Sequence, residues 1–208
     1  NFELIGNFNC SLKDNTLYKV YQILINNGQE QVRVFMQNYA LKVTKNIPSF
    51  AGLGGGSSDG ATLFKMFNEE LNLGLNTKEL ASLGLKIGAD FPFFIYGYLS
   101  ANVSGIGEIV QEFKEDSILF SFLNTDIRCS TPLIYETYRK YYFNLIDEKT
   151  SKKLEKTSSK LLLKKYTMSY LNDLYDPALR IEPSLATLNT KNYFFSGSGS
   201  TFFKPKEL

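Results

Sequence analysis

The sequence predicts an α+β fold for a chain of 208 residues. Two patterns point to it. Apolar residues recur at helical spacing in several segments, and short runs rich in aromatic and β-branched residues are separated by glycine turns. The hydrophobic content of 43%, with 14% aromatic residues, excludes a disordered chain. A change of character near residue 125 divides the sequence into two expected domains, residues 1–125 and 126–208.

The first 48 residues are predicted to form a strand, a helix and a second strand. Residues 1–12 suit a strand whose partner we expect upstream of Asn1. The short polar residues 14–16 offer helix N-cap chemistry, and Asn27-Gly28 suits a helix end. The apolar positions of this helix are Leu17, Val20, Tyr21 and Leu24. Alternation over residues 39–47 predicts the second strand, which Pro48 stops.

The middle of the chain is predicted to contain two helices and then several short strands. A helix is expected over residues 61–72, and another begins at Thr77. Glu79 lies near the start of that second helix, but not at capping-box spacing from Thr77. The short strands are expected at residues 93–96, 98–103, 107–113 and 117–123.

The last third of the chain is predicted to be mainly helical. Helices are expected over residues 133–142, 151–165 and 177–188, followed by strands at 193–195 and 201–203. The segment 151–165 is rich in lysine, so it could be a patch for an anionic ligand or simply a solvated helix face. We favour the solvated face, because charge runs usually coat a surface.

Composition excludes several classes of function. The absence of histidine rules out Ser-His-Asp and Cys-His catalysis and His-ligated zinc within this chain. Cys10 and Cys129 are too few for a four-thiolate metal site and suit free thiols in a reducing compartment. The net charge of +2 gives no general reason to expect nucleic acid. No run of about 18 apolar residues predicts a membrane span, and we expect a cytoplasmic protein.

The most informative stretch runs from Ser49 to Gly60, with five glycines between a predicted strand and a predicted helix. Backbone N–H groups without neighbouring side chains can turn toward one point, and a helix N-terminus adds partial positive charge there. This arrangement favours phosphate binding. The spacing matches neither the P-loop nor the dinucleotide-binding fingerprint. The alternative is a flexible surface loop.

Two further segments are candidates for the site. Asp90 lies among glycine and apolar residues in Gly88–Phe94, surroundings that raise a carboxyl pKa and suit a general base. A turn aspartate that binds backbone amides is the alternative. The loop Ser196–Ser200 suits a hairpin turn, and its glycines would also permit close packing against another loop.

Together these three segments resemble the sequence motifs of the GHMP small-molecule kinases. Within that family, the Gly-Gly-Gly-Ser-Ser-Asp form of the loop is similar to the branch that acts in non-mevalonate isoprenoid precursor biosynthesis. Four further segments have counterparts in that branch, as does the Asp90 segment Gly88–Phe94, in order along nearly the whole chain: Lys45–Pro48, Ser104–Glu108, Ser130–Pro132 and Asn172–Leu174.

The resemblance implies an enzyme that transfers the γ-phosphate of ATP to the 2-hydroxyl of 4-diphosphocytidyl-2-C-methyl-D-erythritol, with Mg²⁺ as cofactor. It implies that Asp90 is the catalytic base. The residues it places at the nucleotide are Asn15, Lys45, Pro48, Gly52, Leu53, Gly54, Gly55, Gly56, Ser57 and Ser58. Those it places at the acceptor are Thr131, Tyr135, Gly197 and Gly199. Tyr135 would stack on the cytosine ring, or else be a half-buried helix aromatic. No residue is assigned as a metal ligand.

The resemblance also implies a two-domain architecture, with a ribosomal-protein-S5-like first domain and a ferredoxin-like second domain. Family members begin with a strand that carries Ala-Lys-x-Asn, followed by a Tyr-His pair, and this sequence contains neither. We therefore expect the first strands of the family fold to be absent and this chain alone to have little or no kinase activity.

Three other interpretations remain at this point. The chain could be another GHMP kinase, of the mevalonate or homoserine type, although the three consecutive glycines argue against it. It could be a nucleotide-binding sensor on the same scaffold, without catalysis. It could also be an α+β domain whose glycine loop has no chemical role. The sequence does not fix an oligomeric state.

Overall fold

The computed structural model describes residues 2–206 and divides the chain into two compact units. The first unit comprises the residues up to Ser49 together with Gly54–Lys114, and the second comprises Phe50–Leu53 together with the residues from Glu115 onward. The change of unit at Lys114 precedes the expected boundary at residue 125. The short segment Phe50–Leu53 lies within the glycine-rich stretch, so this stretch belongs partly to each unit.

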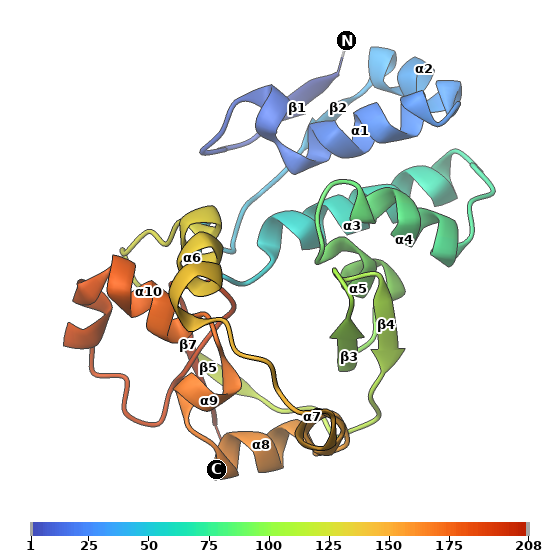
Figure 1. Cartoon of the computed structure of the whole chain (residues 1–208). Coiled ribbons are helices and arrows are strands. Elements are labelled where there is room, and N and C mark those ends of the chain that lie inside the picture. The colour runs from blue at the N-terminus through green and yellow to red at the C-terminus, as the bar shows by residue number, and fades with distance from the viewer. Residues whose placement is uncertain (1, 207–208) are drawn as a thin grey trace. The chain divides into compact units, whose positions relative to one another are not determined.

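Among the described residues, the first unit contains two small sheets, five α-helices and a 3-10 turn at Leu12–Asp14 (Figure 1). Strands β1 and β2 pair in parallel, and β3 and β4 form an antiparallel hairpin. The elements are β1 (Glu3–Ile5), α1 (Thr16–Asn26), α2 (Glu30–Asn38), β2 (Ala40–Lys42), α3 (Gly55–Glu70), α4 (Thr77–Leu85), α5 (Phe91–Tyr96), β3 (Ala101–Ser104) and β4 (Ile109–Glu112).

Strand β1 has a partner within the chain, β2, which was not expected from the sequence. Glu3 pairs with Ala40, and Ile5 pairs with Lys42. Parallel pairing requires a long crossover, which α1 and α2 provide. Helix α2 has no clear signal in the sequence. Its inward residues Val32 and Met36, four positions apart, are too few to stand out in a polar segment.

The core of the first unit lies between α1, α3, α4 and α5, which pack on one another (Figure 1). The predicted stripe on α1 is confirmed, because its four apolar residues are all buried. Asn15 caps this helix, its Oδ1 accepting a hydrogen bond from the Leu17 N–H at 2.9 Å. Phe64 of α3 meets Phe91 of α5 edge to face, with ring centroids 6.2 Å apart.

Two local predictions for this unit are wrong. Residues 93–96 are not a strand but belong to α5, because Pro92 favours a first helical turn and Phe91 and Ile95 bury one face at a spacing of four. Helix α4 does have a capping box. Its N-cap is Asn76, so Glu79 stands at the required third position and accepts a hydrogen bond from the Asn76 N–H at 2.8 Å.

The second unit is a three-stranded antiparallel sheet with short helices. The sheet order is β5-β7-β6, and its core includes the fully buried Phe202, Ile134 and Leu185. The elements are β5 (Phe120–Leu123), α6 (Thr131–Thr137) with a π-helical turn (Tyr138–Tyr142), α7 (Glu148–Glu155), α8 (Ser159–Lys165), α9 (Met168–Leu171), α10 (Tyr175–Ile181) with a 3-10 turn (Pro183–Thr187), β6 (Phe194–Phe195) and β7 (Phe202–Pro205).

The lysine-rich segment 151–165 forms two helices, α7 and α8, rather than the single predicted helix. Asp147 caps α7 by accepting the Thr150 N–H at 3.0 Å, and Ser158 is the N-cap residue of α8. No residue of either helix is buried, as expected for a solvated segment. None of the described helices has the length and apolar character needed to cross a membrane.

Candidate active site

The anion-binding features of the glycine loop come from the start of α3. This helix begins at Gly55, within the glycine run and before the predicted start at residue 61. Gly54 precedes it with a φ of 64°, in the left-handed region that favours glycine, and provides no side-chain cap. The N–H groups of a first helical turn have no partner within the helix. The start of α3 therefore presents donors and partial positive charge, which suit a phosphate.

Close packing explains why the loop contains consecutive glycines. A Cβ on Gly54 would lie 2.8 Å from the Phe94 ring, and one on Gly55 would lie 3.0 Å from Ile47. The Thr16 hydroxyl, at the start of α1, donates to the Gly56 carbonyl at 3.2 Å. Ser57 and Ser58 follow in the first turn of α3. The chain therefore holds the predicted phosphate-binding residues 54–58 in one compact turn of the first unit.

Asp90 precedes the first residue of α5 and leads into it. Its carboxylate makes no capping hydrogen bond to α5, so the alternative of a turn aspartate that binds backbone amides finds no support there. Asp90 is an exposed residue, yet the protein atoms around its carboxyl displace enough water that desolvation raises the pKa of this carboxyl above its ordinary value. A carboxylate with these properties can accept a proton from a hydroxyl.

Helix α5 packs directly on α3, so Asp90 and the phosphate-binding turn share one framework. The Phe91 ring occupies the space over Gly60, where a Cβ would lie 2.5 Å from it. The Lys65 ammonium of α3 donates to the Phe94 carbonyl of α5 at 2.9 Å. Gly107, in the turn between β3 and β4, packs against the residue before Asp90. A Cβ on Gly107 would lie 2.1 Å from the Ala89 carbonyl oxygen.

Lys45 and Asn15 both have structural partners in the first unit. The Lys45 ammonium forms an ion pair with Asp59 of α3, and both side chains are partly buried. Asn15 is 5% exposed and caps α1. Sequence reasoning assigned no role to Asp59. Its pairing with a lysine fourteen positions earlier joins the segment after β2 to the start of α3, and only the fold brings the two together.

In the second unit, Gly52 lies against the C-terminal loop. A Cβ on Gly52 would lie 2.1 Å from the Ser196 carbonyl oxygen and 2.8 Å from the Gly199 nitrogen. The Ser196 hydroxyl donates to the Gly52 carbonyl at 2.8 Å, and the Thr201 N–H donates to the Ala51 carbonyl at 3.1 Å. The Ser196–Ser200 loop thus joins the antiparallel strands β6 and β7, as expected for a hairpin turn, and it also packs against the glycine loop, as its own glycines permit.

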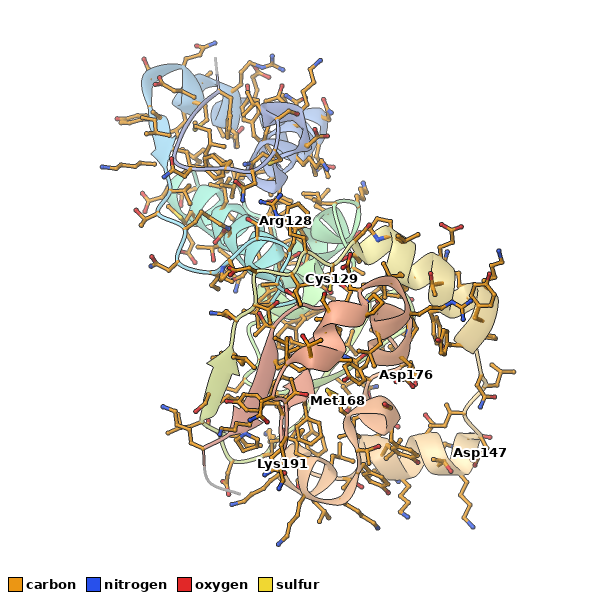
Figure 2. The ribbon with its side chains drawn as sticks, turned by 90° about the vertical axis from the view of Figure 1, so that its left-hand side faces the viewer. Arg128, Cys129, Asp147, Met168, Asp176 and Lys191 are labelled. Atoms are coloured by element: carbon orange, nitrogen blue, oxygen red, sulfur yellow. The ribbon has the colours of Figure 1, made fainter. Side chains whose placement is uncertain are left out.

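The C-terminal loop is also held from two other elements of the second unit. The Asn172 amide donates to the carbonyls of Phe195 and Gly197, both at 2.9 Å. The hydroxyls of Thr131 and Ser198 lie 2.7 Å apart, so Thr131 is tied to the loop at the start of α6. Sequence reasoning noted the Asn172 segment without giving it a role. Figure 2 marks Arg128 and Cys129, which lead into this part of the unit.

The predicted site residues fall into two groups, one in each unit. The first unit holds Asn15, Lys45, Pro48, Gly54, Gly55, Gly56, Ser57, Ser58 and Asp90, and the second holds Gly52, Leu53, Thr131, Tyr135, Gly197 and Gly199. Tyr135, on α6, is 43% exposed, so its ring is available for contact. Pro48 is exposed just before the loop.

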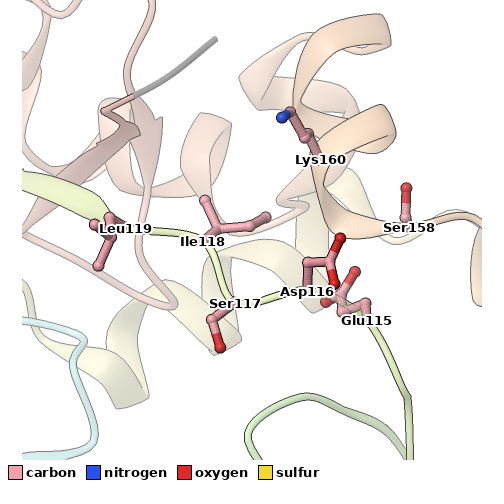
Figure 3. Close-up of a pocket in the computed structure, with 7 residues that line it drawn as sticks. All are labelled: Glu115, Asp116, Ser117, Ile118, Leu119, Ser158 and Lys160. Atoms are coloured by element: carbon pink, nitrogen blue, oxygen red, sulfur yellow. The ribbon is translucent and has the colours of Figure 1, made fainter.

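Other features of the second unit do not involve the predicted site residues. A cavity of about 270 Å³ lies beside the start of α8, and Glu115 is among its lining residues (Figure 3). Glu115 also accepts hydrogen bonds from the Ser159 N–H at 2.8 Å and from the Ser159 hydroxyl at 2.6 Å. Among the described residues, no cluster of three or more His, Cys, Asp or Glu side chains could hold a metal ion.

Comparison with known proteins identifies a matching family model and several similar kinases. A family model for the GHMP kinase N-terminal domain matches residues 15–98. The 4-diphosphocytidyl-2-C-methyl-D-erythritol kinase of Sulfurimonas denitrificans is 50% identical, over 99% of this chain and 79% of its own length. The kinase of the same name from a Sulfurovum species is 44% identical, over 99% of this chain and 81% of its own. The kinase of the same name from Campylobacter jejuni subsp. doylei is 38% identical, over 98% of this chain and 79% of its own length.

A solved structure matches the fold as well. The crystal structure of a 4-(cytidine 5'-diphospho)-2C-methyl-D-erythritol kinase is similar with a TM-score of 0.69 and 26% identity, covering 100% of this chain and 74% of that one. The mixed helix and sheet architecture is thus that of the GHMP kinases, as the sequence predicted. With relatives this similar over almost its whole length, the chain belongs to the GHMP kinase family, in the branch of the 4-diphosphocytidyl-2-C-methyl-D-erythritol kinases.

Proposed function

We propose that this chain transfers the γ-phosphate of ATP to the 2-hydroxyl of 4-diphosphocytidyl-2-C-methyl-D-erythritol, a step in non-mevalonate isoprenoid precursor biosynthesis. The proposal is supported by the names of relatives that are 38–50% identical over nearly the whole chain. The single structural observation that carries it is the packing of α5, which begins after Asp90, onto α3, which begins in the glycine loop.

Asp90 acts in this proposal as the general base. As the substrate hydroxyl oxygen attacks the γ-phosphorus, its proton moves to the Asp90 carboxylate, the bond from the γ-phosphorus to the bridging oxygen breaks, and ADP leaves. Reduced hydration suits Asp90 to this task, because a raised pKa makes its carboxylate a stronger base than an ordinary surface aspartate. Positioning on a packed helix supplies the remaining requirement of phosphoryl transfer.

The glycine loop binds the phosphates of ATP. Backbone donors at Gly54–Ser58, the start of α3, neutralise charge on the phosphate chain, and Gly52 and Leu53 continue the loop. Lys45, Asn15 and Pro48 complete the nucleotide side. The acceptor is bound by Tyr135, whose exposed ring offers a stacking face to cytosine, and by Thr131, Gly197 and Gly199 of the braced C-terminal loop.

Mg²⁺ fits the donor set at the start of α3. This ion usually keeps several waters and is held by substrate phosphates with few protein ligands, so hydroxyls such as those of Ser57 and Ser58 suffice beside a nucleotide. When bound, it would neutralise negative charge on the transferred phosphate. We also propose a cytoplasmic location, which agrees with the free thiols of Cys10 and Cys129.

The function is tested by measuring phosphate transfer with full-length protein that contains this sequence, because little or no activity is expected of this chain alone. The substrates are ATP and 4-diphosphocytidyl-2-C-methyl-D-erythritol, with mevalonate and homoserine as competing acceptors, and ³¹P NMR identifies the position of the new phosphate. We expect transfer to the 2-hydroxyl of the cytidine compound alone. Preferred transfer to mevalonate or homoserine would place the protein in another branch of the family.

The Asp90→Asn variant separates catalysis from binding. It should bind ATP with unchanged affinity by calorimetry and lose turnover. If full-length protein that contains this sequence binds ATP but phosphorylates none of the three acceptors, a nucleotide-binding sensor is the better interpretation. If Asp90→Asn keeps full turnover, Asp90 is not the base.

The role of Lys45 is tested against its partner Asp59. Lys45→Met should raise the KM for ATP by more than Asp59→Asn does, because the second variant keeps the ammonium at the loop. If both variants raise KM equally, the ion pair matters only for the shape of the loop.

A further inference from the structure

A basic pocket of the second unit lies outside the predicted kinase site. It is formed where α8 leads into α9 and meets the strands β6 and β7. Its volume is about 670 Å³, which falls within the range of roughly 300–1,000 Å³ typical of small-molecule sites. None of its lining residues is among those predicted to bind ATP or the acceptor. Figure 2 labels Met168, which lines it, and Lys191, which does not.

Three lysines give this pocket its charge. Lys164 comes from the lysine-rich segment, whereas Lys204 and Lys206 come from β7 and the residue after it. The described residues that line the pocket include no carboxylate. The Lys204 ammonium lies 4.9 Å from the centroid of the Tyr193 ring, which holds this charge on the pocket wall. Positive charge is thus gathered from segments about 40 residues apart.

The remaining lining is partly apolar. Leu163, Met168, Phe194 and Pro205 contribute hydrocarbon or ring surface. Met168 and Phe194 are only partly buried, so the pocket exposes apolar surface beside its ammonium groups. A free inorganic anion would use the lysines but not this surface. A ligand that uses both has an anionic end and an apolar or planar body.

We propose that this pocket binds an organic phosphate or diphosphate, with its phosphate end at Lys164, Lys204 and Lys206 and its apolar or planar body against Met168 and Phe194. The site is separate from the kinase function and does not depend on it. It gives Lys164, near the end of α8, a binding role, while the rest of the lysine-rich segment remains a solvated surface.

Amide chemical shifts of the whole chain test this directly, because they locate binding by residue. Three probes are titrated: inorganic pyrophosphate, geranyl diphosphate with an aliphatic body, and phenyl phosphate with a planar one. We expect saturable shifts at Thr167, Met168 and Asn192. Geranyl diphosphate should bind about tenfold more tightly than pyrophosphate, because its body buries apolar surface. Its affinity relative to phenyl phosphate tells which kind of body the pocket prefers.

Matched lysine variants serve as controls. Lys204→Gln should weaken geranyl diphosphate binding about fivefold, the effect of removing one partly exposed charge, and Lys204→Arg should restore most of it. Lys191→Gln makes the same charge change on a neighbouring lysine that does not line the pocket, and should leave the affinity unchanged. Thermal melting of each variant verifies that it is folded.

Three results would overturn the proposal. Equal affinity for pyrophosphate and both organic probes would indicate general anion binding on a basic surface. An equal loss of geranyl diphosphate affinity in Lys191→Gln and Lys204→Gln would also indicate general anion binding. Shifts confined to residues 52–58 would show that the probes bind only at the phosphate-binding loop.

Discussion

Asp90 illustrates how one residue's surroundings set its chemistry. Its pKa is raised by lost hydration, and a general base works only when deprotonated. The kcat/KM of protein carrying this sequence should therefore fall as the pH is lowered through this raised pKa, above the ordinary aspartate value of about 3.9. A pH profile of kcat/KM measures this. An acid limb that lies at or below pH 4, as for an ordinary aspartate, would contradict the assignment.

The same raised pKa has the opposite consequence for folding. Because the folded state disfavours the charged carboxylate, the contribution of Asp90 to stability is favourable below its folded pKa and is lost as the pH rises through that value. Asp90→Asn should therefore leave the Tm at neutral pH unchanged or raise it, while turnover falls about 10²-fold or more. A lower Tm together with lost turnover would instead indicate a structural role.

The two cysteines should react very differently with thiol reagents. Cys10 is exposed, whereas Cys129 is buried. Burial, with the nearby negative charge of Glu182, raises the pKa of the Cys129 thiol to about 11. Since the thiolate is the reactive form, the native protein at pH 8 should take up one label per chain, and Cys10→Ser should abolish it. Rapid labelling of Cys129 in the folded Cys10→Ser variant would contradict its burial.

At the scale of elements, Gly60 sets the distance between α3 and α5. A Cβ there would lie 2.5 Å from the Phe91 ring, so Gly60→Ala must displace Phe91 and with it the start of α5. We expect a loss of about 1–3 kcal/mol in the free energy of unfolding, typical of overpacking, and a lower kcat because Asp90 moves. Denaturant unfolding and steady-state kinetics measure the two effects.

Met66 provides the control on the same helix. It is 48% exposed, so Met66→Ala should change the unfolding free energy by less than about 0.5 kcal/mol. If Gly60→Ala alters neither stability nor kcat, the contact between α3 and α5 does not position Asp90.

Elements were predictable from sequence where a local pattern decides them. The stripe on α1 and its Asn15 cap lie within ten residues of one another, so periodicity was sufficient. The start of α3 was predicted too late, because glycine has low helix propensity and only packing against Ile47 and Phe94 makes a helical turn favourable there. For α5, tertiary burial of Phe91 and Ile95 overrode the strand preference of an aromatic run.

The motifs of the candidate site were predictable from the sequence, but the contacts that hold its loops in place were not. The glycine loop and the segment around Asp90 are each one continuous stretch of sequence, so each could be recognised by itself. By contrast, Asp59 meets Lys45, and Asn172 meets Phe195 and Gly197, only through the fold. A single sequence gives no signal for contacts between distant segments, so the residues that hold the loops were missed.

At the scale of the whole molecule, the glycine-rich stretch passes from one compact unit to the other between Leu53 and Gly54. Gly52 and Gly54 have similar left-handed φ angles, 69° and 64°. Their surroundings differ, because a Cβ on Gly52 would meet Ser196 and Gly199 of the second unit, whereas one on Gly54 would meet Phe94 of the first. Two glycines separated by one residue, Leu53, thus pack in separate units.

This gives a matched pair of substitutions with separate expected effects. Gly52→Ala should speed amide exchange at Thr201, whose N–H donates to the Ala51 carbonyl, and leave Gly97, which bonds to the Phe93 carbonyl of α5, unaffected. Gly54→Ala should speed amide exchange at Gly97 and leave Thr201 unaffected. Left-handed strain and overpacking together cost about 2 kcal/mol or more, which corresponds to roughly thirtyfold faster exchange at the affected amide.

Hydrogen exchange followed by NMR distinguishes the two possible outcomes. If each variant deprotects only its own amide, the two units open independently, and the loop joins parts that are separately stable. If either variant deprotects Thr201 and Gly97 equally, the chain opens as one cooperative body and the division into units has no energetic meaning. Independent opening would also mean that a substitution in the C-terminal loop can disturb Ala51 and Gly52, the latter a proposed nucleotide-binding residue, while α3 and α5 keep their structure.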